Sequence, residues 1–355
     1  MKKRATLADV ADRAGLSKTA VSLVLNNRPN SRLSADAEQR VRDAARALNY
    51  RPNPAARSLR IRKTRTVGFI SDDVTVTRYA SAMIRGLLDV ADERDHTVVI
   101  AETGSSSKRM QDALEVMIDR QADGVIFGLM AARQIAVPDI PPEVPVVMLN
   151  ATSTQHHPTV LPAEFDAGYE VSRLVVQSGH RAIGVIGDWP YPTFDLARSA
   201  TMSQRFAGIH AGLAEAAVEL SVRIPIRDWE PAAGYAAMRE ILSGETGVTA
   251  VICLNDRLAF GAYQALHEAQ LQVGDDVSVI SFDDDDLASY LRPSLTTARL
   301  PYEQMGRMAM ELLLTEQRDP HQHLVPMPLQ QRQSVRVLTG QRAEAGQVGG
   351  RKAGS

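Results

Sequence analysis

The chain has 355 residues, of which 44% are hydrophobic and 23% charged, and its 40 Lys and Arg nearly balance 42 Asp and Glu. This length is too great for one small domain and suits a small module joined to a two-lobed body of roughly 270 residues. We find no signal peptide, no run of 18 apolar residues and a single cysteine within an apolar run, which excludes membrane-spanning and disulfide-rich classes and leads us to expect a cytoplasmic protein.

Charge is distributed unevenly along the chain. Residues 1–65 hold 16 Lys and Arg against 5 Asp and Glu, a balance of +11, so that with −2 overall the remainder carries −13. A basic head on an acidic body is typical of proteins that bind nucleic acids. The alternative, a merely solvated basic face, is disfavoured because the charge coincides with a helix-turn-helix pattern.

Three short helices are expected near the N-terminus. Thr6 is placed to cap the first helix, Asp9 lies in its first turn, and apolar residues recur at helical spacing until Gly15. Ser17 can cap a second helix that runs to about residue 26, and a third is expected at about 34–49. The second helix turns outward several polar side chains that can reach base edges in a major groove: Ser17, Lys18, Thr19, Ser22 and Asn26.

A short basic helix is expected after the proline-bounded stretch 50–54. Asn53 can cap this helix, Pro54 suits its first position, and it extends to about Leu59. The helix is too short to be stable alone, and Leu59 has no local core to enter.

The segments ATLADVADRAGLSKTAVSLVLN and LNYRPNPAARSL closely resemble the start of the lactose-repressor (LacI/GalR) family of bacterial transcription regulators. The resemblance implies that the second helix reads the major groove of an operator, and that the short helix is a hinge that folds on DNA. Leu59 matches the leucine that this family wedges between base pairs from the minor groove. Lys18, Thr19 and Ser22 are then expected to read bases, and the further DNA-binding positions are Thr6, Ser17, Asn26, Tyr50, Asn53 and Arg57.

Beyond the basic connector, apolar runs of strand length alternate with helical segments. Strands are expected at 66–71, 96–101, 123–128, 145–149, 182–187, 249–254 and 277–282. Helices are expected between them at 79–93, 108–121, 164–178, 203–217, 231–243 and 256–270. Two successive series of this kind predict two parallel sheets covered by helices on both faces. Segments 295–300 and 332–338, the second expected as a strand, are predicted to cross back, one to each lobe.

The predicted architecture is an all-α helix-turn-helix head with a hinge helix, followed by an α/β body of two doubly wound parallel-sheet lobes, like that of periplasmic binding proteins. The head is expected at 1–50, the hinge and linker at 51–63, and the body at 64–340. Within the body, the first lobe takes about 64–161 with 293–324, and the second about 162–292 with 325–340. The polar, Gly-rich tail 341–355 is expected to be disordered, and its lack of leucine heptads favours a homodimer.

Ligands in such folds bind at the carboxyl ends of strands, in the cleft between the lobes. The polar residues that follow predicted strands are therefore candidates for binding an effector: Ser71, Asp72, Asp73, Asn150, Asp188, Trp189, Asn255, Asp256 and Asp283. Carboxylates, amides and an aromatic ring suit the hydroxyls and apolar face of a sugar. The family resemblance supports Asn255 or Asp256 and also Asp283, and it adds Tyr79, Thr201, Arg205 and Trp229 as effector contacts.

Several of these residues have a structural alternative. Asp256 could simply cap its helix, Arg205 could form a surface salt bridge, and Trp229 could belong to the core. A nucleobase or nucleoside also stays open as effector, because Tyr79 and Trp229 could sandwich a flat ring.

No metal or cofactor is expected. The acidic run 283–286 lacks the alternating spacing and central glycine of a calcium loop, and His321 and His323 have no partner ligands.

Motifs of enzymes are also missing from the sequence, which contains no GxxxxGK[ST], GxSxG or HExxH. This disfavours a sugar-modifying enzyme with a DNA-binding head, and the head itself disfavours a transport-type solute-binding protein. We expect a dimeric transcription regulator, most readily a repressor, that binds a near-palindromic double-stranded operator. A sugar is favoured as its small-molecule effector because the cleft is expected to be acidic.

Overall fold

The computed structural model describes residues 5–25, 33–50, 63–75, 78–189, 191, 193–244, 246–315 and 320–338. The chain divides into two compact units, one comprising residues up to 66 with 120–123 and the other comprising the rest. The predicted hinge residues Asn53, Arg57 and Leu59 lie outside the described residues, as do Asn26 and the C-terminal tail. Among the helices that are described, none is both long and apolar enough to cross a membrane.

The helix-turn-helix unit has three described helices, which are α1 (Leu7–Ala14), α2 (Lys18–Leu25) and α3 (Ala35–Ala47). A capping box starts α1, in which the Thr6 hydroxyl accepts a hydrogen bond from the Asp9 N–H and the Asp9 carboxylate accepts one from the Thr6 N–H. The helix ends at Gly15, whose φ of 66° costs a glycine little. Ser17 and Ser34 each accept a hydrogen bond from the backbone N–H three residues on, so both cap their helices as predicted.

The core of the head is small and built from short side chains, namely Val10, Ala11, Ala14, Val21, Val24, Val41, Ala44 and Ala45. Arg40 of α3 adds a polar link by donating from Nη1 to the carbonyl of Ala14, 3.1 Å away, at the end of α1. The apolar residues predicted at helical spacing up to Gly15 do form the inward face of α1. Lys18 and Thr19 remain exposed at the start of α2, where a nucleic acid can reach them.

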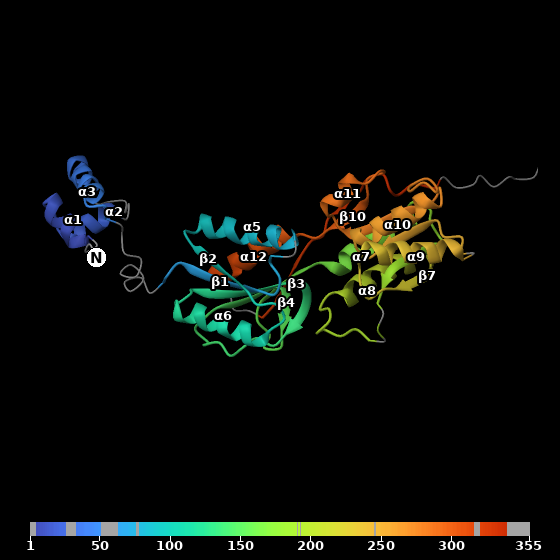
Figure 1. Ribbon diagram of the computed structural model, residues 1–355, viewed down its shortest axis with the longest axis horizontal. Coiled ribbons are helices and arrows are strands. Elements are labelled where there is room, and N and C mark those ends of the chain that lie inside the picture. The colour runs from blue at the N-terminus through green and yellow to red at the C-terminus, as the bar shows by residue number, and fades with distance from the viewer. Residues whose placement is uncertain are drawn as a thin grey trace, which may run out of the picture. The chain divides into compact units, whose positions relative to one another are not determined.

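The first lobe of the body is built on a six-stranded sheet in the order β11-β5-β4-β3-β1-β2. Its strands are β1 (Thr66–Ser71), β2 (Thr97–Glu102), β3 (Gly124–Ile135), β4 (Val146–Ser153), β5 (Thr159–Pro162) and β11 (Gln322–Val325). Its helices are α5 (Arg78–Glu93), α6 (Ser107–Asp119) and α12 (Tyr302–Leu314). Figure 1 shows α5 and α12 on one side of this sheet and α6 on the other.

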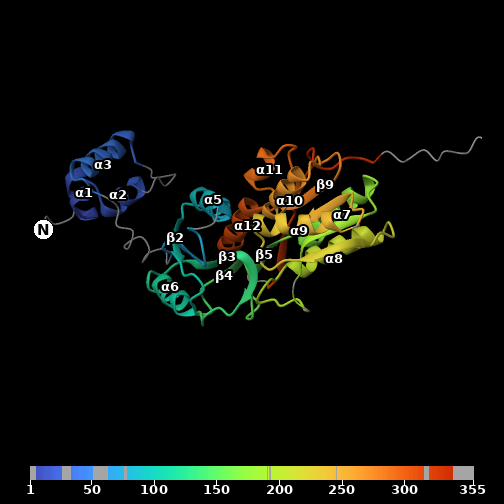
Figure 2. The same cartoon turned by 45° about the vertical axis from the view of Figure 1, so that its right-hand side comes forward.

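The second lobe has a six-stranded sheet in the order β12-β10-β9-β8-β6-β7. Its strands are β6 (Ile183–Asp188), β7 (Leu220–Pro225), β8 (Ala250–Cys253), β9 (Ser278–Asp283), β10 (Thr296–Arg299) and β12 (Leu329–Gln330). Its helices are α7 (Glu164–Gln177), α8 (Met202–Ala214), α9 (Pro231–Ser243), α10 (Asp256–Glu268) and α11 (Asp286–Tyr290). β10 and β12 pair antiparallel, whereas β6 to β10 pair in parallel. Both ribbon views place α7 beside α8 and α9 beside α10 (Figures 1 and 2).

The two lobes exchange segments at three points of the chain, between β5 and α7, between β10 and α12, and between β11 and β12. Two sequence expectations are wrong here. Residues 293–299 were expected in the first lobe but belong to the second, because β10 pairs in parallel with β9 of the second sheet. Segment 332–338 forms no strand and stays with the second lobe, where the Ser334 carbonyl accepts a hydrogen bond from the Val279 N–H.

Glycines allow the paired helices of each lobe to touch backbone to backbone. A Cβ atom placed on Gly86 of α5 would lie 2.0 Å from the carbonyl oxygen of Glu303 in α12, and one on Gly306 would lie 2.2 Å from that of Met83. Reciprocal glycines serve the α7–α8 and α9–α10 pairs in the same way, namely Gly168, Gly208, Gly234 and Gly261. These contacts set the helix separation more tightly than side-chain packing would allow.

Candidate functional site

A cleft of about 450 Å³ lies between the two lobes of the body. Eight of the thirteen residues proposed from the sequence as effector contacts line it: Tyr79, Asn150, Trp189, Thr201, Arg205, Trp229, Asn255 and Asp283. They come from α5 and β4 of the first lobe and from strand ends and helix starts of the second. Parallel strands bring their carboxyl ends to one edge of each sheet, which explains how residues distant in sequence converge.

Arg205 occupies the floor of the cleft and is only 4% exposed. Its guanidinium forms a two-point ion pair with Glu164, with Nε–Oε2 at 2.6 Å and Nη2–Oε1 at 2.8 Å, and donates from Nη1 to the carbonyl of Leu254. The group also lies over the ring of Phe282, 4.3 Å from its centroid. Three of its five N–H donors are thus engaged, which leaves two for another partner. The ion pair is buried, so the surface salt bridge considered for Arg205 does not describe it.

Asp283 ends β9 at the cleft with an unusual backbone, since its φ of 112° is seldom adopted by a side-chain-bearing residue. Burial raises the pKa of its carboxyl well above the usual range, the charge of Asp256 adds to this rise, and Arg205 opposes it. The Tyr79 hydroxyl lies 3.4 Å from Asp283 Oδ2 and 3.3 Å from Asp285 Oδ2. Because Tyr79 belongs to the first lobe and the two acids to the second, these contacts span the cleft.

Asn150 and Thr201 present polar atoms to the cleft that the described protein does not fully use. Asn150 ends the buried part of β4 with a φ of 50° and donates its amide to the carbonyls of Leu129 and Met130, so its Oδ1 acceptor remains. Thr201 precedes α8 without capping it, because Ser199 accepts the nearby backbone N–H groups instead. Both side chains are nearly buried, and each keeps hydrogen-bonding capacity for a ligand.

Trp229 and Asn255 support one another at the second-lobe wall. The indole N–H of Trp229 donates to the carbonyl of Ile226 at 3.2 Å, and the side chain both packs against the core of the second lobe and lines the cleft. Asn255 caps α10 by accepting from the Leu258 N–H and donates its amide to the Trp229 carbonyl. The core alternative for Trp229 is therefore half correct, because the side chain both packs on the core and lines the cleft.

The structure does not bring Asp256, an expected effector contact, to the cleft. This carboxylate is fully buried and does not line the cleft. Its Oδ1 accepts from Ser281 and Thr297 hydroxyls and its Oδ2 accepts from the Asp285 N–H, so it joins α10 to β9 and β10. Helix capping is not its role either, since Asn255 caps α10.

The other strand-end acids are also committed to the protein, and the expectation of an acidic cleft is therefore wrong. Asp72 lies 3.1 Å from Arg133 Nη1, and Asp188 receives two hydrogen bonds from Arg223. Neither they nor Ser71 and Asp73 line the cleft. The charged lining residues are instead two acids and three arginines, namely Glu164, Asp283, Arg198, Arg205 and Arg227.

Sequence reasoning missed several lining residues, including Glu164, Tyr191, Arg198, Arg227 and Tyr302. Glu164 is the first residue of α7 and closely follows the short strand β5, which the sequence pattern does not predict. Arg198 and Arg227 follow irregular loops, which carry no periodic signal. Tyr302 packs against Tyr79 with ring centroids 5.4 Å apart and starts α12, directly after a lobe crossing.

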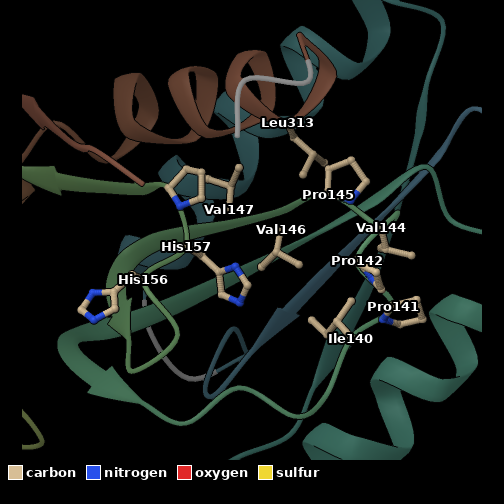
Figure 3. Close-up of a pocket in the computed structure, with 11 residues that line it drawn as sticks. Ile140, Pro141, Pro142, Val144, Pro145, Val146, Val147, His156, His157 and Leu313 are labelled. Atoms are coloured by element: carbon tan, nitrogen blue, oxygen red, sulfur yellow. The ribbon is translucent and has the colours of Figure 1, made fainter. Parts of the chain in front are cut away.

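A second cavity, of about 160 Å³, lies wholly within the first lobe. Figure 3 shows Val146, Val147, Leu313 and several prolines around it, with the rings of His156 and His157 at one side. Burial lowers the pKa of His157, which favours its neutral form. No charged group converges there, and none of the predicted effector residues lines it. Within the described residues no group of three or more His, Cys, Asp or Glu could hold a metal ion.

On the head, the predicted base-reading residues share one helix. Lys18 and Thr19 are exposed in the first turn of α2, and Ser22 one turn later is half-buried. Tyr50 packs against the head core, so it supports the head as well as lying near its surface. The hydroxyls of Thr6 and Ser17 are engaged in helix caps.

Both the head and the body of this chain resemble known proteins. Residues 6–53 match the family "Bacterial regulatory proteins, lacI family", and residues 173–335 match a "Periplasmic binding protein-like domain". A ribose operon repressor of Haemophilus influenzae is 30% identical over 325 residues, covering 90% of this chain and 94% of that protein. A transcriptional repressor PurR of Erwinia tasmaniensis is 32% identical over 343 residues, covering 93% and 97%.

Among solved structures, the Lac repressor dimer bound to operator and the anti-inducer ONPF superposes with a TM-score of 0.76 and 25% identity, covering 94% of this chain and all of that one. The fold predicted from sequence, a helix-turn-helix head with a two-lobed parallel-sheet body, is confirmed. These relatives repress transcription and are not enzymes. The chain belongs to the LacI family of bacterial regulatory proteins and is a DNA-binding transcriptional repressor.

Proposed function

We propose that this repressor binds a small polar effector, a sugar or sugar derivative, in the cleft between its lobes, and that the effector controls operator affinity. The observation that carries the proposal is the convergence of eight predicted side chains from both lobes on one cleft. Buried polar groups with unused donors and acceptors, such as Arg205 and Asn150, are suited to hydroxyl groups. Aromatic rings such as Trp229 are suited to the apolar face of a sugar ring.

Coupling to DNA follows from contacts across the cleft. Tyr79 of the first lobe reaches Asp283 and Asp285 of the second. A ligand that takes over Asp283 competes with this contact and favours a different lobe arrangement. A change in lobe arrangement would be transmitted through the hinge and linker, residues 51–63, to the heads, which makes operator and effector binding reciprocal.

The DNA-bound state is proposed to be a homodimer. Two heads would place α2 in successive major grooves of a near-palindromic operator, with Lys18, Thr19 and Ser22 at base edges. Thr6, Ser17, Asn26 and Tyr50 would contact the backbone. Asn53, Arg57 and Leu59 would act in the central minor groove by the family resemblance.

A thermal-shift screen of the full chain against sugars, sugar derivatives and nucleobases tests the effector half of the proposal. A ligand at a hundred times its dissociation constant adds about 2.7 kcal/mol to the unfolding free energy, which a melting curve resolves. Asp283→Asn should reduce the shift, whereas Asp276→Asn, on an exposed turn of the same lobe, should leave it unchanged. A shift that survives Asp283→Asn in full would place the ligand elsewhere.

A nucleobase effector is the second candidate, and the aromatic lining favours it. Tyr79, Trp189, Tyr191, Trp229 and Tyr302 all face the cleft, and flat rings stack on such side chains. Screening hits confined to nucleobases, with loss of affinity in Trp229→Leu, would select this reading over the sugar.

A further inference from the structure

The mouth of the cleft carries two arginines that the proposed sugar site does not require. Arg198 lies in the loop before α8, and Arg227 lies just after β7. We call these two residues the mouth arginines. Their guanidinium carbons lie 4.2 Å and 5.6 Å from the ring centroid of the same side chain, Tyr191, which also lines the cleft. One aromatic ring therefore gathers two cations at one place.

Few negative charges offset the mouth arginines. Arg227 has neither an ion pair nor a hydrogen bond within the part of the chain that the structure describes. The acid nearest Arg198 is Asp195, with Nε–Oδ2 at 3.8 Å and both side chains more than half exposed, so this pair contributes little. Like charges brought together in this way repel one another, and an anion bound between them would remove that cost.

The other charged residues that line the cleft do not neutralise the two mouth arginines. Arg205 and Glu164 neutralise each other in their two-point ion pair. Asp283 is then the one remaining acid of the lining, and its burial favours the protonated form. Comparable arginines elsewhere in the body face carboxylates, as Arg133 faces Asp72 and Arg223 faces Asp188. The cleft is thus a basic site in an acidic body.

We propose that the effector carries an anionic group, a phosphate or a carboxylate, which the two mouth arginines bind while the rest of the molecule extends toward Asn150, Arg205 and Asp283. The inference rests on the proposed function, because it specifies the ligand of the same cleft. A planar guanidinium donates two parallel hydrogen bonds to phosphate or carboxylate oxygens, and stacking on Tyr191 restricts its orientations beforehand. A neutral sugar or base would leave both cations without such a partner.

Tryptophan fluorescence of the full chain provides a local measurement, because both of its tryptophans, Trp189 and Trp229, line the cleft. The first probe is inorganic phosphate. Hexoses and pentoses are then compared with the corresponding sugar phosphates and sugar acids, and nucleobases serve as neutral aromatic compounds. Sodium chloride at equal ionic strength provides the baseline. We expect a saturable response to inorganic phosphate, and tighter binding of one anionic sugar class than of its neutral parents. Saturation by sugar phosphates alone identifies a phosphate ligand, and saturation by sugar acids alone a carboxylate ligand.

Arg198→Gln and Arg227→Gln should each weaken the anionic response roughly tenfold or more, because each removes charged hydrogen bonds. Arg239→Gln is the matched control. Arg239 also lies over a tyrosine ring, 5.8 Å from the centroid of Tyr235, but is outside the cleft, so its loss should leave the titration unchanged.

Two results would overturn the inference. A phosphate response no larger than that of chloride, with no anionic sugar binding, shows that the mouth arginines hold no anion. The inference also fails if a neutral compound gives a saturable fluorescence change with equal affinity in wild type, Arg198→Gln and Arg227→Gln. In that case the compound binds in the cleft without the mouth arginines, and the proposed function still holds. The proposed function fails separately if ligands that stabilise the protein leave the tryptophan emission unchanged.

Discussion

Arg205 and Glu164 show how a single pair can serve both structure and binding. Both side chains are 4% exposed, and the pair joins the first turn of α8 to the first turn of α7, beside a lobe crossing. Removing one partner leaves the other charge buried, which typically costs about 3–5 kcal/mol. A lost effector response in Arg205→Ala alone would therefore mix damage to the fold with damage to the site.

A double substitution separates the two effects. Arg205→Met should destabilise the body by about 3–5 kcal/mol, and adding Glu164→Leu should restore most of that stability, because an apolar pair replaces the ion pair. The effector response should stay absent in the double variant. Urea unfolding measures stability, and a ligand titration measures the response. A stable double variant with a normal response would remove Arg205 from the site.

Asp256 makes the stability of the body depend on pH. Burial raises the pKa of its carboxyl to about 6, above the roughly 3.9 of an unfolded chain. The folded state therefore holds a proton that the unfolded state releases, and this stabilisation, up to about 3 kcal/mol, is lost as pH rises through 6. Asp256→Asn should be less stable overall, because one acceptor is lost, but should fall less between pH 5 and 7 than wild type. Denaturant midpoints of wild type and Asp256→Asn at pH 5 and pH 7 test this prediction. An equal loss of stability between the two pH values in both proteins would contradict it.

At the scale of elements, hydrophobic patterns located strands and helices well because these segments are long and buried. All seven expected strands and six expected body helices are present within about four residues of their predicted bounds, except that β3 runs on to Ile135, well past the predicted end at residue 128. The strands β5, β11 and β12 were not predicted because each has only two to four residues. Strand β7 was not predicted either, since it lies at the edge of its sheet and only one of its residues is buried. The cleft was predicted from strand ends, yet strand-end position does not say which way a side chain turns. Asp256 turns inward to hydroxyls, and Asn255 beside it lines the cleft.

Helix α2 should discriminate between operator and other DNA. Lys18 is exposed in its first turn, where a base contact is worth about 1–3 kcal/mol. Lys18→Ala should therefore weaken operator binding more than binding to unrelated duplex, as measured by fluorescence anisotropy at fixed salt. Arg42→Ala on α3 removes the same charge from an exposed helix and should affect both duplexes alike. An equal loss on both duplexes in Lys18→Ala would reduce its role to phosphate contact.

The α7–α8 pair links backbone packing to the cleft. A Cβ on Gly168 would lie 2.2 Å from the carbonyl oxygen of Arg205, so Gly168→Ala must push α8 away and shift Arg205. We expect a loss of about 1–3 kcal/mol in stability together with weaker effector binding. Gly244→Ala, where the nearest atom is 3.3 Å away in the Thr246 side chain, should change neither. Normal effector affinity in Gly168→Ala would show that the site tolerates movement of α8.

At the scale of the whole molecule, the hinge should couple the heads to the body without supporting either. Leu59→Ala should weaken operator binding, because the wedge into the minor groove is lost, while leaving the melting temperature and the effector affinity as in wild type. Anisotropy with operator DNA, melting curves and ligand titration form the set of measurements. Unchanged operator affinity would reject the assignment of Leu59 as the wedge.

The glycine contacts between helices also bear on how such a regulator acquires new ligands. Backbone-to-backbone packing in the α5–α12, α7–α8 and α9–α10 pairs leaves almost no room for a larger residue at these glycines, so each helix pair behaves as a rigid piece. The loops that carry Arg198 and Arg227 lie outside these contacts. Substitutions in these loops can therefore change which effector is bound, while the helix packing that couples effector binding to operator binding stays the same.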